Sequence, residues 1–196
     1  MTTDIKSPKV LDNVFSDLDF IFLKNFALSI EKNEKNYEPA WGRYVSKDKI
    51  FREYSNKYLL PIAKKYFEKE NLILTHSVFA EYKTSEAVVD KHKDLNAATY
   101  VLNVTLYEDF PWPLYIEGQE YYYGPNQGII YTGEHQDHWR NPVNTSASLG
   151  ILFSAFVEPD HWWVTEGPGY GKVSWEEITK EEYYSNKEMY DRSFFE

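Results

Sequence analysis

The chain has 196 residues, of which 42% are hydrophobic and 27% are charged, and this length and composition are typical of one globular domain with a single core. The formal net charge of −10 argues against nucleic acid as a partner, because nucleic-acid binding depends on clustered Lys and Arg side chains. The chain contains no cysteine, which excludes disulfides and thiolate metal sites and leaves histidines and carboxylates as ligands for Fe(II), Mn(II) or Zn(II).

The N-terminal part of the chain predicts helices. Residues 1–13 are expected to form an irregular arm. They lack the apolar run of a signal peptide, and no stretch of the chain reaches the length of a membrane span, so the default expectation is a cytoplasmic protein without a membrane partner. Ser16 and Asp19 predict a helix start, and the polar stretch Glu31–Glu38 predicts a loop. A second helical pattern begins near Ser46, and Pro61 is expected to kink or restart it.

From about Leu72 onward the pattern changes to short β-rich runs separated by turns. The runs are Leu72–Thr75, Val78–Tyr82, Ala98–Tyr107, Leu114–Ile116, Gly128–Tyr131 and Ser148–Val157. Helices followed by many short strands predict a mainly β member of the α+β class, in which helices pack against an antiparallel sandwich or barrel.

We expect residues 1–196 to form one domain, with supporting helices over about 14–70, a β core over about 72–157 and an acidic, aromatic C-terminal extension over 158–196. Within the extension, Ser174 and Glu177 predict a short helix. The extension is compatible with a lid over a site, with a homodimer contact or with simple packing, and the sequence does not choose among them.

The most informative short motif is His92-Lys93-Asp94. In an extended segment, residues i and i+2 point to the same side, so the imidazole of His92 and the carboxylate of Asp94 project together. That pair supplies two of the three ligands of a facial triad, in which the remaining positions on the metal stay open. Because three-residue patterns arise by chance, the motif alone is weak. A third ligand has to come from a distant strand, and the downstream histidines His135 and His138 are the candidates.

The order of these features resembles the Fe(II)- and 2-oxoglutarate-dependent oxygenases, particularly the prolyl-hydroxylase-like branch. The shared features are Tyr82 on a strand before the motif, His92-Lys93-Asp94, the turn Pro125-Asn126-Gln127-Gly128, a distal His138 followed by Pro142-Val143, and the closing hydrophobic strand Leu149–Val157. The resemblance covers roughly residues 79–157. It implies a double-stranded β-helix, also called a jelly roll, and an enzyme that uses Fe(II) and the cosubstrate 2-oxoglutarate.

Carried over residue by residue, the resemblance makes His92, Asp94 and His138 the metal ligands. His138 is preferred to His135 because Pro142-Val143 then has the spacing of the family and Arg140 shares the face of His138. His135 becomes a residue of the rim or one that supports a metal ligand from behind, and His76 and His161 are expected to be structural. The resemblance also implies hydroxylation of an amino-acid, peptidyl or other small substrate, because family members that halogenate lack the carboxylate that Asp94 provides.

The sequence departs from the family at the residue that binds the far carboxylate of 2-oxoglutarate. The family normally has Arg or Lys there, and this chain has Ser148. A hydroxyl does not replace the charge or the two parallel hydrogen bonds of a guanidinium. We therefore expect Arg140 to bind the carboxylate, with the hydroxyls of Ser146, Ser148 and Tyr82 as further contacts, although Arg140 is also compatible with a salt bridge at the barrel rim. Lys83 and Lys93 are weaker candidates, because each is expected to face away from the interior.

Two other functions stay open at this point. The first is a cupin-like metalloenzyme that does not use 2-oxoglutarate, which the missing cation at Ser148 favours. The second is a non-catalytic sandwich that binds a ligand while its histidines have no metal. For the wall of a pocket the sequence offers aromatic side chains, namely Trp112, Tyr115, Trp139 and the run Tyr121-Tyr122-Tyr123.

Overall fold

The protein is described here from a computed structural model. The structure describes residues 5–32, 35–38, 41–83, 85, 87, 89–94, 97–142 and 147–166. The expected helix after Ser174, the predicted contact of Ser146 and the position of Val143 lie outside the described residues. In the described part of the chain, no helix combines the length and the apolar character needed to cross a membrane.

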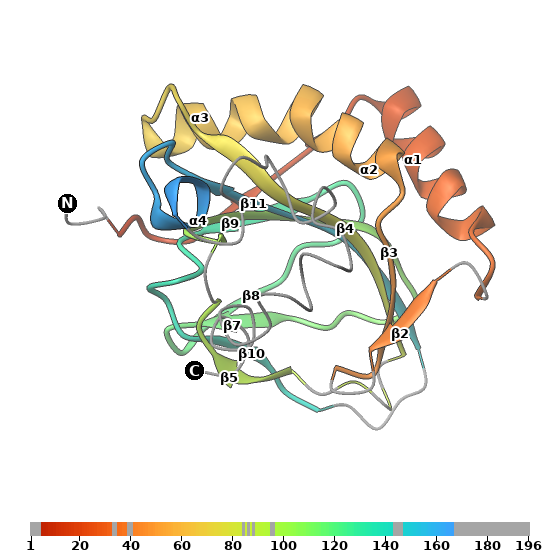
Figure 1. Ribbon diagram of the computed structural model, residues 1–196. Helices are drawn as coiled ribbons and strands as arrows, with labels where there is room; N and C mark the ends of the chain where they lie inside the picture. The colour runs from red at the N-terminus through yellow and green to blue at the C-terminus, as the bar shows by residue number, and fades with distance from the viewer. Residues whose placement is uncertain are drawn as a thin grey trace.

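Two antiparallel sheets face each other and form the body of the molecule (Figure 1). The larger sheet contains, in spatial order, β1 (Lys9–Leu11), β9 (Gly128–Tyr131), β6 (Tyr100–Glu108), β11 (Ser148–Val157), β4 (Ile73–Lys83), β3 (Arg43–Ser46) and β2 (Asn36–Glu38). The smaller sheet contains β5 (Val89–His92), β10 (His138–Arg140), β7 (Leu114–Ile116) and β8 (Gln119–Tyr121). Strands distant in sequence are therefore neighbours, which is the arrangement of a jelly roll.

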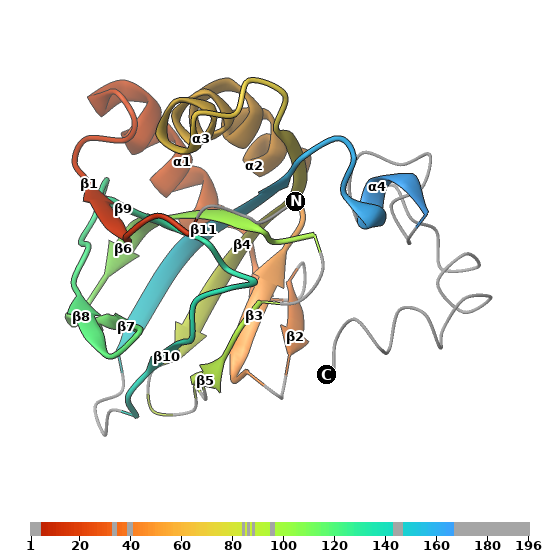
Figure 2. The ribbon, with the colours of Figure 1, turned by 90° about the vertical axis from the view of Figure 1, so that its left-hand side faces the viewer.

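A layer of helices covers the outer face of the larger sheet, while the smaller sheet lies on its other face (Figures 1 and 2). The layer consists of α1 (Asp17–Ser29), α2 (Lys49–Tyr54), the π-helical turn η2 (Ser55–Leu59) and α3 (Leu60–Phe67). Between this layer and the sheet lies a core of buried apolar side chains, in which the rings of Phe51 and Phe79 stack with centroids 5.2 Å apart. A short helix, α4 (Trp162–Thr165), follows β11.

The turn η2 is attached to the sheet by hydroxyl groups. Ser55 Oγ lies 2.9 Å from Ser77 Oγ on β4 and 2.8 Å from Ser154 Oγ on β11. The Leu60 N–H bonds to the Ser55 carbonyl, five residues back, directly before Pro61. Pro61 has no N–H of its own to continue the helical pattern, and it lies within the first turn of α3. The expected interruption at Pro61 is therefore realised as a π-helical turn inside a continuous helical segment.

Most predicted elements are confirmed, and the differences concern short or edge strands. The strands over Leu114–Ile116, Gly128–Tyr131 and Ser148–Val157 have the predicted bounds, and the two runs between Leu72 and Tyr82 form one strand, β4. Two expectations are wrong. Part of the expected loop Glu31–Glu38 is strand β2, and part of the expected irregular arm is strand β1, because each gains a ladder of hydrogen bonds at an edge of the larger sheet.

Candidate metal centre and cavity

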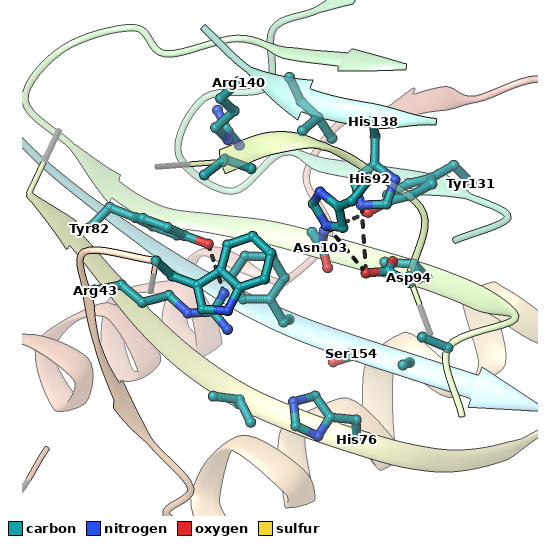
Figure 3. Close-up of a pocket in the computed structure, with 18 of the residues that line it drawn as sticks. Arg43, His76, Tyr82, His92, Asp94, Asn103, Tyr131, His138, Arg140 and Ser154 are labelled. Atoms are coloured by element: carbon teal, nitrogen blue, oxygen red, sulfur yellow. Dashed lines mark hydrogen bonds and ion pairs between the residues drawn. The ribbon is translucent and has the colours of Figure 1, made fainter. Parts of the chain in front are cut away.

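The three predicted metal ligands meet in one place, on the side of the smaller sheet that faces the larger sheet (Figure 3). His92 ends β5 and His138 begins β10, and the two residues are register partners on adjacent antiparallel strands. Asp94 follows His92 by two residues and projects to the same side. One ligand atom from each of the three residues lies within 4.8 Å of the others. Asp94 Oδ1 is 3.6 Å from His138 Nε2 and 3.9 Å from His92 Nε2.

Backbone carbonyls orient both imidazoles. His92 Nδ1 lies 2.7 Å from the Asp90 carbonyl oxygen, and His138 Nδ1 lies 2.9 Å from the Gln136 carbonyl oxygen. Because a carbonyl oxygen only accepts, each Nδ1 carries the hydrogen and each Nε2 keeps its lone pair. Both lone pairs are then available on the side of Asp94, which is how histidine ligands are fixed in metal sites.

Charge and burial shift the pKa values of the three side chains of the triad in different directions. Burial would raise the pKa of Asp94, but the neighbouring imidazoles of His138 and His92 lower it below its ordinary value. Burial would lower the pKa of His138, but the Asp94 carboxylate outweighs burial and raises it. The pKa of His92 is lowered by burial and by the charge of His138. Asp94 is therefore an ionised oxygen ligand beside two nitrogen ligands, a donor set that suits a divalent iron, manganese or zinc ion.

Gly133 makes the position of Asp94 possible. The Asp94 N–H donates to the Gly133 carbonyl at 3.0 Å, so the two backbones run close together. A Cβ at residue 133 would lie 2.4 Å from Asp94 Oδ2 and 2.6 Å from the Ala98 carbonyl oxygen. Only glycine leaves the Asp94 carboxylate where it is.

The triad opens into a cavity of about 160 Å³ between the two sheets. Besides the triad, the lining residues with polar or charged side chains are Arg43, His76, Tyr82, Asn103, Tyr123, Tyr131 and Arg140. Ser154 also lines the cavity, but its hydroxyl contacts Ser55 on the helical side of the sheet. The apolar part of the wall includes Trp41, Val78, Leu114 and Phe153. His76, which we expected to be purely structural, is therefore a lining residue.

Arg140 lies in this cavity, as predicted, and only 6% of its surface is exposed. Its Nη2 donates to Tyr123 Oη at 2.7 Å, and its guanidinium lies 5.2 Å from the ring centroid of Trp112. Within the part of the chain that the structure describes, no carboxylate forms an ion pair with it. A buried guanidinium without a counter-charge is costly, so this position favours an anionic ligand.

The other predicted contacts are placed differently. Tyr82 lines the cavity, and its hydroxyl accepts a hydrogen bond from Arg43 Nη1 at 2.8 Å. Ser148 does not line the cavity. It pairs with Lys83, whose Nζ donates to its hydroxyl on the opposite face of the larger sheet from Tyr82. Because strand residues alternate between faces, the expectation that Ser148 contributes a hydroxyl to the pocket is wrong.

The candidate aromatic residues divide in the same way. Tyr123 lines the cavity, and Trp112 packs behind Arg140 without lining it. Tyr115 and Trp139 stack on each other, with ring centroids 5.5 Å apart, on the other face of the smaller sheet. The alternation that directs His138 and Arg140 inward turns Trp139 outward. His135 is not part of the metal group.

Arg43 and Asn103 are among the lining residues that the sequence reasoning missed. Arg43 comes from a short strand within a predicted connecting region, so nothing marked it. Asn103 lies on β6, and its buried Oδ1 has no hydrogen-bond partner among the described residues, while its Nδ2 is 3.5 Å from Tyr131 Oη. A buried amide oxygen of this kind is a position where a ligand or water is expected.

No protein-family model matches the chain, and no curated protein matches it in sequence. Solved structures do match. A viral collagen prolyl hydroxylase from Paramecium Bursaria Chlorella virus-1, in complex with 2-oxoglutarate, has a TM-score of 0.58 and 12% identity, over 80% of this chain and 98% of that one.

A prolyl-4-hydroxylase from Pseudomonas putida has a TM-score of 0.62 and 13% identity, over 77% of this chain and 92% of that one. HygX from Streptomyces hygroscopicus, with nickel, 2-oxoglutarate and hygromycin B bound, has a TM-score of 0.60 and 10% identity, over 78% of this chain and 83% of that one. At these identities the likeness concerns the fold, and the chain therefore has the double-stranded β-helix fold of the 2-oxoglutarate-dependent oxygenases.

Proposed function

We propose that the chain is an Fe(II)- and 2-oxoglutarate-dependent oxygenase that hydroxylates an amino-acid, peptidyl or other small substrate. The single observation that carries the proposal is one cavity that holds both a His-Asp-His group and a buried arginine without a carboxylate partner among the described residues. The matched structures support it, because among them are proteins crystallised with 2-oxoglutarate and with iron or nickel.

The donor set fits the metal. His92, Asp94 and His138 would hold Fe(II) on one side only and leave the cavity side free for other ligands. With dioxygen as the oxidant, bound Fe(II) and 2-oxoglutarate would supply the oxidising chemistry: one oxygen atom would go to the substrate as its hydroxyl group and the other to the succinate that forms when the oxo acid loses carbon dioxide. The chain contributes the orientation of the two imidazoles through Asp90 and Gln136, and the ionised state of Asp94.

Arg140 would bind the far carboxylate of the cosubstrate. A guanidinium offers several N–H donors in one plane, and Tyr123 occupies only part of this set. The apolar and aromatic walls keep water away and strengthen such a charge pair. Asn103, with its unpaired amide oxygen, would contribute a further polar contact inside the cavity.

The test is to add Fe(II) and 2-oxoglutarate to the metal-free protein under anaerobic conditions and to record the visible charge-transfer band of the chelate. We expect a band in the wild type and in His135→Ala, and none in Asp94→Ala or His138→Ala. Bound iron without a band would favour a metalloenzyme that does not use 2-oxoglutarate. A protein that retains neither iron nor 2-oxoglutarate would contradict the proposal and favour a non-catalytic binding protein.

A further inference from the structure

The cavity contains a second guanidinium, and its position differs from that of Arg140. Arg43 comes from β3 on the larger sheet, pairs in register with Tyr82 of β4 and points into the cavity from the side opposite the smaller sheet (Figure 3). A 2-oxoglutarate molecule has two carboxylates. One would bind the metal and the other would need one cation, so a cavity with two guanidiniums has one more than the cosubstrate requires.

Arg140 is the better partner for the cosubstrate, and Arg43 is left for another ligand. Arg140 is buried without an ion pair among the described residues, so it needs an anion to be stable. Arg43 already has a counter-charge, because its Nε donates to Glu38 Oε2 at 2.6 Å. Its side chain is 21% exposed and that of Glu38 is 37% exposed, so the pair is accessible from solvent. Arg43 lines the cavity, and Glu38 lies beside it without lining it.

The Glu38–Arg43 pair leaves hydrogen-bonding groups available on both partners. Arg43 uses Nε for Glu38 and Nη1 for Tyr82, and no hydrogen bond from its Nη2 is formed within the described part of the chain. Glu38 retains acceptor capacity on its carboxylate. A lone carboxylate ligand would be repelled by Glu38, whereas a ligand with one positive and one negative group matches both members of the pair.

Trp41 directs such a ligand toward the metal ligands. Its ring centroid lies 5.1 Å from that of His92, and the Arg43 guanidinium lies 5.3 Å from the Trp41 ring. A small molecule held by Glu38 and Arg43 would therefore lie against the Trp41 ring, directly beside a ligand of the metal. The aliphatic or aromatic part of the molecule would pack on Trp41, where it would exclude water.

We propose that Glu38, Trp41 and Arg43 form the substrate subsite and that the substrate is a free, zwitterionic amino acid. Its carboxylate binds Arg43, its ammonium binds Glu38, and its side chain lies between Trp41 and the metal. This inference rests on the proposed oxygenase function and narrows its substrate class. A residue inside a peptide lacks both backbone charges, so it would offer neither a carboxylate to Arg43 nor an ammonium to Glu38.

The experiment is a calorimetric titration of the standard amino acids into the protein loaded with Ni(II) and 2-oxoglutarate, which prevents turnover. We expect saturable binding of at least one amino acid. Its C-terminal amide and its N-acetyl derivative should each bind at least about tenfold more weakly, as expected for the loss of one charge-assisted pair. Arg43→Gln and Glu38→Gln should weaken binding to a similar degree, whereas Arg52→Gln on α2, in the helical layer, is the matched control and should not.

The outcomes separate this inference from the proposed function. If the wild type binds Ni(II) and 2-oxoglutarate but no amino acid, or binds the amide as tightly as the acid, the subsite proposal is wrong and the oxygenase proposal stands. Loss of 2-oxoglutarate binding in Arg43→Gln would reassign Arg43 to the cosubstrate and also overturn the subsite. Failure of the wild type to bind 2-oxoglutarate overturns both. The amide comparison uses unmodified protein, so it does not depend on the folding of any variant.

Discussion

Arg140 is the residue on which the identity of the cosubstrate depends. Replacement with Gln keeps a hydrogen-bond donor for Tyr123 but removes the charge. Because the far carboxylate would then lie in a buried site without a cation, we expect the Kd of 2-oxoglutarate, measured by the charge-transfer band, to rise by about two orders of magnitude, the effect of losing roughly 3 kcal/mol from a buried charged hydrogen bond.

The control for this prediction is Lys83→Gln. Lys83 lies on the opposite face of the larger sheet, where it bonds to Ser148 and to Glu81. The Lys83→Gln variant should therefore leave the Kd of 2-oxoglutarate unchanged. An unchanged Kd in Arg140→Gln together with a raised Kd in Lys83→Gln would contradict the geometry of the cavity.

Replacement of Gly133 is expected to lower both the stability of the protein and its affinity for Fe(II). In Gly133→Ala the added methyl group would overlap the Asp94 carboxylate and the Ala98 carbonyl. We expect a loss of about 1–3 kcal/mol of stability from overpacking and a fall in Fe(II) affinity on the order of 10- to 100-fold, as for a displaced supporting contact. Chemical denaturation and a metal titration measure the two effects.

Gly118→Ala separates the local effect from the general effect of replacing glycine. Gly118 has φ +80° and no atom within 4 Å of an added Cβ, so the variant is strained without touching the metal site. It should lose some stability and keep its Fe(II) affinity. Equal Fe(II) affinities in the two alanine variants would show that Gly133 has no special relation to Asp94.

At the residue scale the sequence was sufficient to single out the three side chains that meet as candidate metal ligands, and insufficient for the rest of the cavity. His92 and Asp94 are two residues apart on an extended segment, and period 2 predicts their common side. The same rule, applied from His138, predicts Arg140. Arg43 and Asn103 belong to strands that join the site only through the pairing of distant segments. No local pattern reports that pairing, and alignment on Pro142-Val143 did not reveal that Ser148 faces outward.

Among the elements, the hairpin of β2 and β3 brings Glu38 and Arg43 to the cavity. A buried ion pair holds the start of this hairpin against β4. Lys35 Nζ, directly before β2, lies 2.8 Å from Glu81 Oε2 on β4, and the two side chains are 4% and 11% exposed. Glu81→Gln would leave the ammonium of Lys35 without a full counter-charge, so we expect a loss on the order of 3 kcal/mol of stability. Denaturant unfolding measures the loss.

The Lys35–Glu81 ion pair also predicts how the stability of the protein changes at acidic pH. Burial would raise the pKa of Glu81, but hydrogen bonds from Lys35 and Lys83 lower it below its ordinary value. A carboxyl whose pKa is lowered by folding contributes stability above its unfolded pKa and loses it as the pH falls through the folded pKa. The wild type should therefore lose more stability than Glu81→Gln between neutral and acidic pH. Glu68→Gln, at the exposed Lys6 pair, should follow the wild type.

Elements differ in how well the sequence predicts them. The long strands β4, β6 and β11 are rich in apolar residues on both faces because both faces are buried, one under the helices and one against the cavity. β1, β2 and β8 have three residues each and depend on a neighbouring strand for their hydrogen bonds. None of their residues is buried, unlike Leu114 and Ile116 of the equally short β7, so these strands follow from the tertiary structure and not from propensity.

At the scale of the whole molecule, a bound metal would connect parts of the fold that are otherwise joined by short ladders. His92 and His138 belong to the smaller sheet, whose β5 and β10 have four and three residues. Asp94 is tied by its N–H to Gly133, which follows β9 of the larger sheet. A metal that binds all three ligands in the native state and has little affinity for the unfolded chain stabilises the whole domain.

We therefore expect Ni(II) at 100-fold over its Kd to stabilise the wild type by about 2.7 kcal/mol, which for a chain of this length raises the Tm by roughly 5–10 °C. His138→Ala should lose this increase, and His135→Ala should keep it, because His135 is outside the metal group. Differential scanning calorimetry measures both. If His138→Ala still gained the full increase, the ion would be bound elsewhere, and the ligands assigned on β5 and β10 would be wrong. If neither variant nor the wild type gained it, the three side chains would meet in the fold without binding a metal.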